Sequence, residues 1–214
     1  MNKQIKKDKA DLLHGPLLKP IILFAIPLAA SGMLQQLFNA ADTAVVGRFA
    51  GSEAMAAVGS NASVIHLIIA LFTGLSVGAN VVTASLIGQD RREKIGDAVH
   101  TSVAVALLSG VFLLFLGQIL ARPILTLMGT PEEVMEHAVL YLKLYFAGMP
   151  FVMLYNFTSA LLRSMGDSGR PLIALIVAGV INVCLNMILV IVFRMGVAGV
   201  AIATVISNVI SSGI

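Results

Sequence analysis

Charged residues are scarce in this sequence. Only 12% of the 214 residues are Asp, Glu, Lys or Arg, against about 25% in a typical soluble domain. Hydrophobic residues make up 58% of the chain, and its mean hydropathy is +0.95. This composition excludes an ordinary soluble protein and indicates an integral membrane protein.

Reactive groups are scarce as well. The one cysteine, Cys184, lies in an apolar run, so the sequence holds neither a disulfide framework nor a thiolate metal site. It has no phosphate-binding GxxxxGKS or GxxxxGKT loop, no metal-spaced His or Cys cluster and no Ser/His/Asp set. We therefore expect no enzyme and no cofactor. The basic residues lie in short loops instead of one patch, which argues against a nucleic-acid partner.

Long uncharged intervals remain when the sequence is divided at its charged residues. Each can supply the roughly 20 residues that cross a bilayer as a helix, and none shows the short alternation of barrel strands. The intervals are 20–41, 54–89, 98–121, 144–162, 171–193 and 195–214. The sequence predicts an all-α integral membrane protein, with a cytoplasmic N-terminal segment at 1–16 and a six-transmembrane-helix bundle at 17–214. Thr130 is expected to cap the fourth helix, with Pro131 as its first residue.

Basic residues are distributed unevenly between the two sides of this bundle. Of the 14 Lys and Arg residues, ten fall in segments on the side of the N-terminus and four on the other side. Loops rich in Lys and Arg stay in the cytoplasm. We therefore predict a multi-pass protein of the cell membrane with a cytoplasmic N-terminus.

One acidic residue, Asp42, lies inside the first apolar run, whereas the other acids fall in loops or at helix ends. An ionisable group within a membrane span is a functional candidate by default, because its burial is costly. Gln35, Asn39 and Asp42 are spaced i, i+4, i+7, which places them on one helix face. That face is expected to meet water or protein.

Further polar residues are expected at the level of Asp42. Asn182 and Asn186 share a face of the fifth span, and Thr204 in the sixth span returns to nearly the depth of Asn186. A carboxylate among amides and a hydroxyl can bind a proton or hold a small cation such as sodium. The alternative is a hydrogen-bond network that only joins the helices. Weaker candidates, for a cavity wall, are Gln35, Asn39, Asn208 and Tyr145.

Several segments together resemble the first half of a multidrug and toxic compound extrusion (MATE) transporter. They are "LFNAADTAVVGRFAGSEAMAAVG" (37–59), "GANVVTASLIGQDRREK" (78–94), "LLRSMGDSGRP" (161–171), "GVINVCLNMILV" (179–190) and "GVAGVAIATVISN" (196–208). The resemblance implies one lobe of a twelve-helix, two-lobed antiporter, which exports cationic and amphipathic compounds in exchange for protons or sodium. The second lobe would come from the same longer chain or from dimerisation.

The resemblance also implies roles for individual residues. It places the coupling acid of the first helix at Asp42, the asparagine of the fifth helix at Asn182 and the threonine of the sixth at Thr204. Many members carry a second aspartate where this sequence has Asn186, so both protons and sodium remain open as coupling ions. Two other functions also remain open: a flippase for lipid-linked precursors, and an inactive membrane fragment or scaffold, because the sequence ends within its sixth apolar run.

The predicted orientation can be tested with single cysteines in a background where Cys184 is replaced by serine. Cysteines near Arg91 and Asp167 should react with a membrane-impermeant maleimide only from the cytoplasmic side, because these turns lie on the basic side. Cysteines near Glu132 should react only from outside. The opposite pattern of labelling would contradict the N-inside orientation.

Overall fold

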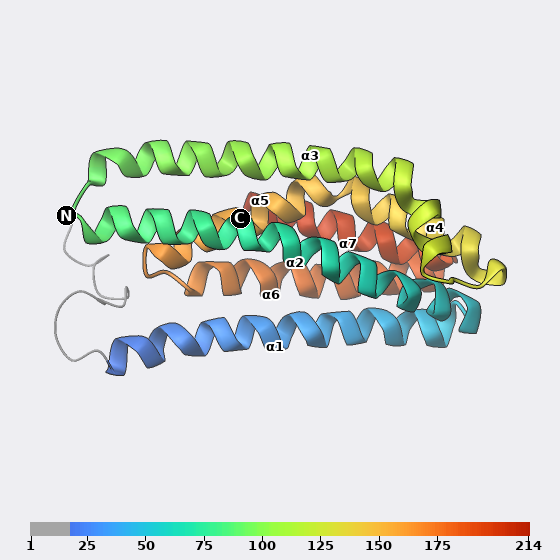
Figure 1. The fold of residues 1–214 in the computed structure, drawn as a ribbon. Helices are drawn as coiled ribbons and strands as arrows, with labels where there is room; N and C mark the ends of the chain where they lie inside the picture. The colour runs from blue at the N-terminus through green and yellow to red at the C-terminus, as the bar shows by residue number, and fades with distance from the viewer. Residues whose placement is uncertain (1–17) are drawn as a thin grey trace.

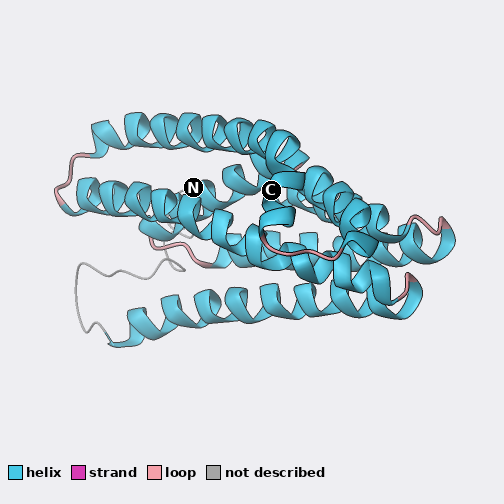
Figure 2. Ribbon diagram, turned by 45° about the vertical axis from the view of Figure 1, so that its right-hand side comes forward, coloured by secondary structure: helices cyan, strands magenta, loops and turns pink. Residues whose placement is uncertain are grey.

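The computed structural model describes residues 18–214, which form helices joined by short connections (Figure 2). The α-helices are α1 (Leu18–Phe49), α2 (Ser52–Gly88), α3 (Ile95–Leu127), α4 (Glu132–Ala147), α5 (Met149–Ser164), α6 (Gly169–Asn186) and α7 (Gly196–Gly213). A 3-10 helix, η1 (Arg92–Lys94), precedes α3, and a π-helix, η2 (Met187–Val192), follows α6. Most helices lie along one common direction, with α1 and α3 on opposite sides (Figure 1). The predicted segment 1–16 lies outside the described residues.

The described helices include five that are long and apolar enough to cross a membrane, namely α1, α2, α3, α6 with η2, and α7. Helices α4 and α5 meet the same criterion only as a pair, which is bent by 50°. Counted as one span, this pair brings the total to six. The prediction of an all-α membrane bundle is therefore confirmed, and the chain is a multi-pass membrane protein.

The fourth span differs from the sequence prediction. It is not one helix over 144–162, because the helix breaks at Gly148 between α4 and α5. Pro150, two residues later, has no N–H for the carbonyl four residues earlier, so a continuous helix loses a hydrogen bond there. The predicted start was also wrong by one residue, because Pro131 is the N-cap and α4 begins at Glu132.

Two other spans extend at both ends beyond the uncharged intervals that predicted them, 20–41 and 98–121. Helix α1 continues past Asp42 to Phe49, and α3 runs from Ile95 to Leu127. A charged residue marks the edge of the apolar region, but it does not end the hydrogen-bond ladder of a helix. Uncharged length therefore predicts the existence of a span better than its ends.

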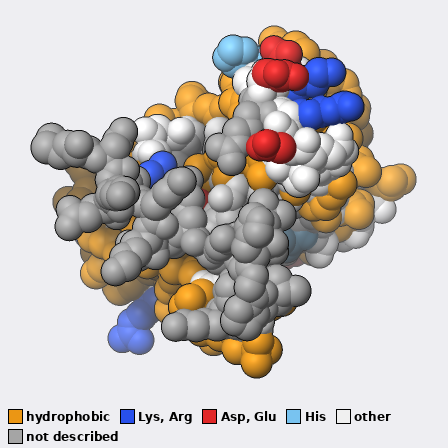
Figure 3. All heavy atoms as spheres, turned by 90° about the vertical axis from the view of Figure 1, so that its left-hand side faces the viewer, with side chains coloured by type: hydrophobic (Ala, Val, Ile, Leu, Met, Phe, Trp, Pro, Cys, Tyr) orange, Lys and Arg blue, Asp and Glu red, His pale blue; other side chains and the backbone are white. Residues whose placement is uncertain are grey.

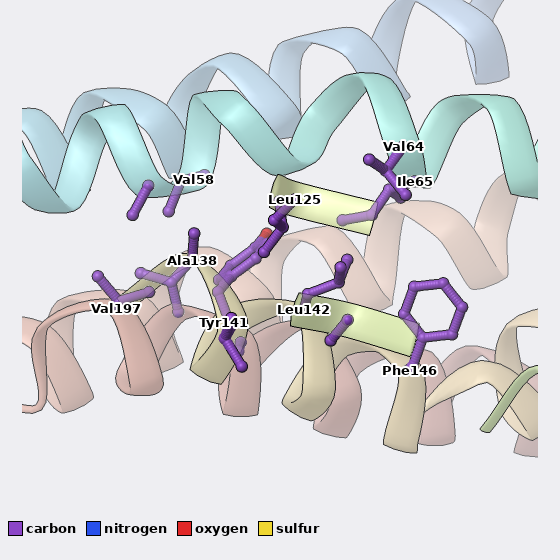
Figure 4. Packing of buried hydrophobic residues seen from close by; sticks show 14 of the residues in the cluster. Val58, Val64, Ile65, Leu125, Ala138, Tyr141, Leu142, Phe146 and Val197 are labelled. Atoms are coloured by element: carbon purple, nitrogen blue, oxygen red, sulfur yellow. The ribbon is translucent and has the colours of Figure 1, made fainter. Parts of the chain in front are cut away.

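The core lies around α4, which packs against α2, α3 and α7. Figure 4 shows side chains of α2 and α4 facing one another, with Val197 of α7 beside Ala138 of α4. Phe146 and Leu142 of α4 are buried. Large apolar side chains remain exposed on the outer faces of α1, α2 and α3, as lipid contact requires. Viewed from one end of the bundle, charged side chains gather on the end face with apolar side chains around them (Figure 3).

Close helix contact around the bend depends on glycine. A Cβ at Gly110 of α3 would lie 2.4 Å from the Cα of Pro150, and one at Gly148 would lie 2.9 Å from a methyl group of Val205 in α7. Small residues let membrane helices approach closely and gain dispersion contacts. The bend between α4 and α5 is thus fixed between α3 and α7.

Gly110→Ala should destabilise the bundle, because the new methyl group meets backbone atoms that cannot turn aside. We expect a loss of about 1–3 kcal/mol, as for other overpacked sites. The matched control is Gly74→Ala, where a Cβ meets nothing within 4 Å. That control should be neutral or slightly stabilising, because alanine favours the helix. The midpoint of thermal unfolding in detergent measures both, and a Gly110→Ala midpoint at or above that of the parent would contradict this packing.

Candidate functional site

The site begins with the contact between α1 and α6. A Cβ at Gly179 of α6 would lie 1.9 Å from Cε2 of Phe38, so only glycine leaves room for the aromatic ring. The two helices run in the same direction (Figure 1). Asp42 follows Phe38 by about one turn, while Asn182 and Asn186 follow Gly179 by about one and two turns. The packing of Phe38 therefore brings Asp42 to the polar face of α6.

A chain of hydrogen bonds joins the four residues proposed for ion coupling. Nδ2 of Asn186 donates to Oδ1 of Asp42 at 2.5 Å and to Oδ1 of Asn182 at 3.1 Å. Nδ2 of Asn182 in turn donates to Oγ1 of Thr204 at 3.4 Å. Asn182 and Asn186 are buried, whereas Asp42 and Thr204 are partly exposed. The structure thus brings together the residues that the sequence grouped, from α1, α6 and α7.

One buried atom of this hydrogen-bond network has no partner. Oδ1 of Asn186 is buried and accepts no hydrogen bond from any described residue. The hydroxyl of Thr204 donates to the carbonyl of Val200, one turn earlier in its own helix, at 2.9 Å. An unsatisfied buried acceptor is costly unless a further donor or cation reaches it. The network therefore retains an oxygen that can take a proton donor or a metal ion.

The position of Thr204 differs from the predicted level. Thr204 meets Asn182 and not Asn186, which lies one turn further along α6. The reason is η2, in which the N–H of Phe193 bonds to the carbonyl of Ile188 five residues earlier. A π-helix has more residues per turn and so rises less per residue. The fifth span is therefore shorter than an uninterrupted α-helix of the same residues would be. As a result, Thr204 in the returning sixth span lies at the level of Asn182 instead of Asn186.

A polar cavity of about 380 Å³ opens beside this network. Residues from all the described α-helices except α3 line it. Asp42, Asn182 and Thr204 contribute to its wall, while Asn186 lies behind them. The four weaker cavity candidates, Gln35, Asn39, Asn208 and Tyr145, also line it.

Further residues line the cavity, including Thr73, Tyr155, Asn156 and Arg163. Of these, Thr73 and Arg163 were not predicted to lie in a cavity wall. Asn156 and Arg163 are spaced i, i+7 in α5, and Val152 precedes Asn156 by four residues, so one helix face carries all three. This spacing was present in the sequence. Arg163 was counted only as a topology signal, because it stands at the end of an apolar interval.

Comparison with known proteins identifies the family. Residues 27–188 match the model of the MatE family. The chain belongs to the MATE family. The resemblance seen in the sequence is thereby confirmed. MATE proteins are transporters, so the expectation that the chain is not an enzyme fits its family.

Individual MATE relatives are similar over nearly the whole chain. The probable multidrug resistance protein YoeA of Bacillus subtilis is 36% identical over 191 residues, which cover 87% of this chain and 41% of the relative. The FAD transporter of Shewanella oneidensis is 26% identical over 205 residues, covering 94% of this chain and 45% of the relative. A crystal structure of MATE in the bent conformation superposes with a TM-score of 0.88 at 31% identity, over 95% of this chain and 45% of that one. The chain spans less than half the length of these proteins, as an N-terminal lobe would.

Asn186→Leu tests the hydrogen-bond network. The substitution keeps the approximate size of the side chain but removes the donor to Asp42 and to Asn182. Hydrogen bonds to charged groups contribute about 1.5–3 kcal/mol, so we expect a clear drop in the midpoint of thermal unfolding at neutral pH.

Asn39→Leu is the control for this measurement. Its amide lies on the same cavity, but its side chain is exposed and contacts Gln36 at 3.4 Å. Loss of an exposed amide should change the midpoint little. Equal midpoints for the two variants would contradict a structural bond between α1 and α6.

Proposed function

We propose that this chain is the first lobe of an ion-coupled multidrug exporter, which exchanges protons or sodium for cationic and amphipathic compounds. A second six-helix lobe, in the same longer chain or from a second copy, supplies the opposite wall. The N-terminus lies in the cytoplasm. The observation that carries the proposal is Asp42, a membrane carboxylate bonded to α6 and reaching α7 through Asn182, at the wall of a polar cavity.

The placement of Asp42 supports a role that changes with its charge. A carboxylate needed only to join two helices would be more costly than an amide, because ionised groups are poorly tolerated inside a membrane. Asp42 borders a cavity, which gives protons and ions access to it. It also contacts a neighbouring helix directly. A change of charge at Asp42 therefore acts on the position of α1 against α6.

The amide network responds to protonation in a definite way. When Asp42 is ionised, it accepts a hydrogen bond from Nδ2 of Asn186. When Asp42 is protonated, its hydroxyl becomes a donor and requires an acceptor, which Oδ1 of Asn186 supplies if the amide turns over. Asn182 and Thr204 then reverse their hydrogen bond in the same sense, with Thr204 donating to Asn182. Protonation would thus be transmitted from α1 through α6 to α7.

Sodium can use the same oxygen atoms. The carboxylate of Asp42, the amide oxygens of Asn182 and Asn186, and the hydroxyl of Thr204 are hard ligands of the kind that bind small cations. The site has a single carboxylate, because Asn186 replaces the second acid of many relatives. It therefore neutralises one positive charge, whether that charge is a proton or a sodium ion.

The cavity wall suits organic cations and amphipathic compounds. Apolar and aromatic side chains such as Phe38, Ile69 and Tyr145 stand among amides and hydroxyls, a mixture typical of small-molecule sites. YoeA bears a multidrug resistance name, whereas the Shewanella oneidensis relative is named for FAD. The first name supports drug export here, and a flippase or an inactive scaffold gives the Asp42 network no comparable role.

Asp42→Asn separates coupling from structure. The amide keeps the size and hydrogen bonding of the side chain but removes the titratable charge. We expect normal membrane expression and a reduction of ion-driven dye efflux by at least about tenfold, equivalent to about 1.4 kcal/mol or more. The assay uses vesicles that contain the two-lobed protein, under an imposed proton gradient and, separately, a sodium gradient.

Asp97→Asn is the matched control, because Asp97 is an exposed acid in the first turn of α3, away from the cavity. It should leave efflux unchanged. If Asp42→Asn transports as well as the parent under both gradients, Asp42 is only a contact residue and the coupling proposal fails.

A further inference from the structure

A second charged residue lines the cavity at the end away from Asp42. Arg163 lies in the last turn of α5, next to the turn that leads into α6, and its side chain is half-buried. Of the described lining residues, only Asp42 and Arg163 carry a full charge. Near Arg163, the hydroxyl of Tyr155 bonds to the carbonyl of Pro171 at the start of α6. Asn186 lies about 22 Å further along α6, so the two charges stand at opposite ends of the cavity.

The guanidinium of Arg163 has no hydrogen bond or ion pair with any described residue, in contrast to those of Arg122 and Arg170. Arg170, in the same region, pairs with Asp167 at 3.2 Å. Arg122, at the opposite end of the bundle, pairs with Glu136 at 2.9 Å. A guanidinium has five donors and no acceptor, and the nitrogen atoms of Arg163 are not among the buried unpartnered atoms of the described residues, so they stay accessible at the cavity wall. Arg163 is therefore able to take an anion from outside the described chain.

Membrane topology alone does not explain this placement. An arginine at the cytoplasmic end of a helix favours the N-inside orientation and interacts well with the helix C-terminus. Both effects need only a positive charge near the membrane surface, and Arg170 provides one that is exposed and paired. Neither effect requires a side chain in the wall of the Asp42 cavity.

We infer that Arg163 is an anion-binding subsite, which holds a carboxylate or phosphate group of an amphipathic molecule. The planar guanidinium matches both groups with two parallel hydrogen bonds. The apolar part of that molecule would lie along Leu175 and Ala178 of α6, which line the stretch of cavity between the two charged residues. The inference rests on the proposed function in one respect, that the bound molecule is a transported one. It assigns a named residue to the anionic group that some amphipathic compounds carry.

The test compares two dyes that differ by one charge. Rhodamine B carries a free carboxylate and is zwitterionic, whereas its ethyl ester is a permanent cation of almost the same shape. Binding to the purified chain in phosphatidylcholine nanodiscs is measured by fluorescence anisotropy, with empty nanodiscs subtracted. Arg163→Gln should weaken binding of the carboxylate dye at least about tenfold, and that of the ester by no more than about twofold.

Two further variants make the result specific. Arg163→Lys keeps the charge and the topology signal but lacks the planar fork, so binding of the carboxylate dye should be intermediate. Arg170→Gln removes one positive charge from the same region and should change neither dye. Melting midpoints verify that all variants are folded. Equal loss of both dyes in Arg163→Gln, or the same selective loss in Arg170→Gln, would overturn the inference.

A lipid arm identifies the source of the anion. Phosphatidylglycerol is added to the nanodiscs, and the bound carboxylate dye is measured for the parent and for Arg163→Gln. If the lipid displaces dye from the parent but not from Arg163→Gln, a lipid headgroup occupies the subsite. If the lipid displaces dye from neither protein, the subsite binds soluble compounds. Either result leaves Arg163 as an anion-binding residue. The proposed function has its own readout in efflux that depends on Asp42. If Arg163→Gln selectively loses the carboxylate dye but efflux does not depend on Asp42, the subsite is supported and the proposed exporter function fails. If efflux depends on Asp42 but the loss of dye binding is not selective, the exporter function is supported and the subsite fails.

Discussion

The hydrogen bond between Asp42 and Asn186 is the interaction on which the rest of this structure depends. It joins side chains 144 positions apart in the sequence and links α1 to α6 within the membrane-spanning part of both helices. A carboxylate in a membrane needs a donor or a route to water, and Asp42 has both. Because α1 packs chiefly on α6, the charge of this one side chain acts on the main contact of the first helix with the lobe.

The bond is possible only because the backbone makes room for it. Gly179 lets the ring of Phe38 lie against α6, which sets the height of Asp42. On the other side, η2 shortens the end of the fifth span, and the tight turn after it contains Arg194 and Gly196 at positive φ. This turn sets the level at which Thr204 reaches Asn182. Three helices therefore converge through packing and backbone geometry, and the polar side chains complete the contact.

Sequence periodicity predicted much of this arrangement and missed the rest for identifiable reasons. Helical spacing placed Asp42, Asn182 and Asn186 on inward faces, because a 3.6-residue repeat fixes which side chains share a face. It did not reveal the break at Gly148, since glycine and proline also occur within unbroken membrane helices. It placed Thr204 one turn too high, because a π-helix leaves no simple residue pattern. Arg163 was assigned to topology, because its position in the cavity depends on how α5 packs against other helices.

The separation of the two charged residues gives the cavity a direction. Asp42 and Arg163 lie on the order of 20 Å apart, more than the Debye length of about 8 Å at physiological salt, so neither neutralises the other across a hydrated cavity. The charge on each side chain is therefore left for molecules that enter the cavity to balance. On the proposed function, a proton or sodium ion would compete with a substrate cation at Asp42, but it would not compete with a substrate anion at Arg163. Exchange would then take place at one end of the cavity, while the other end would select what is exchanged.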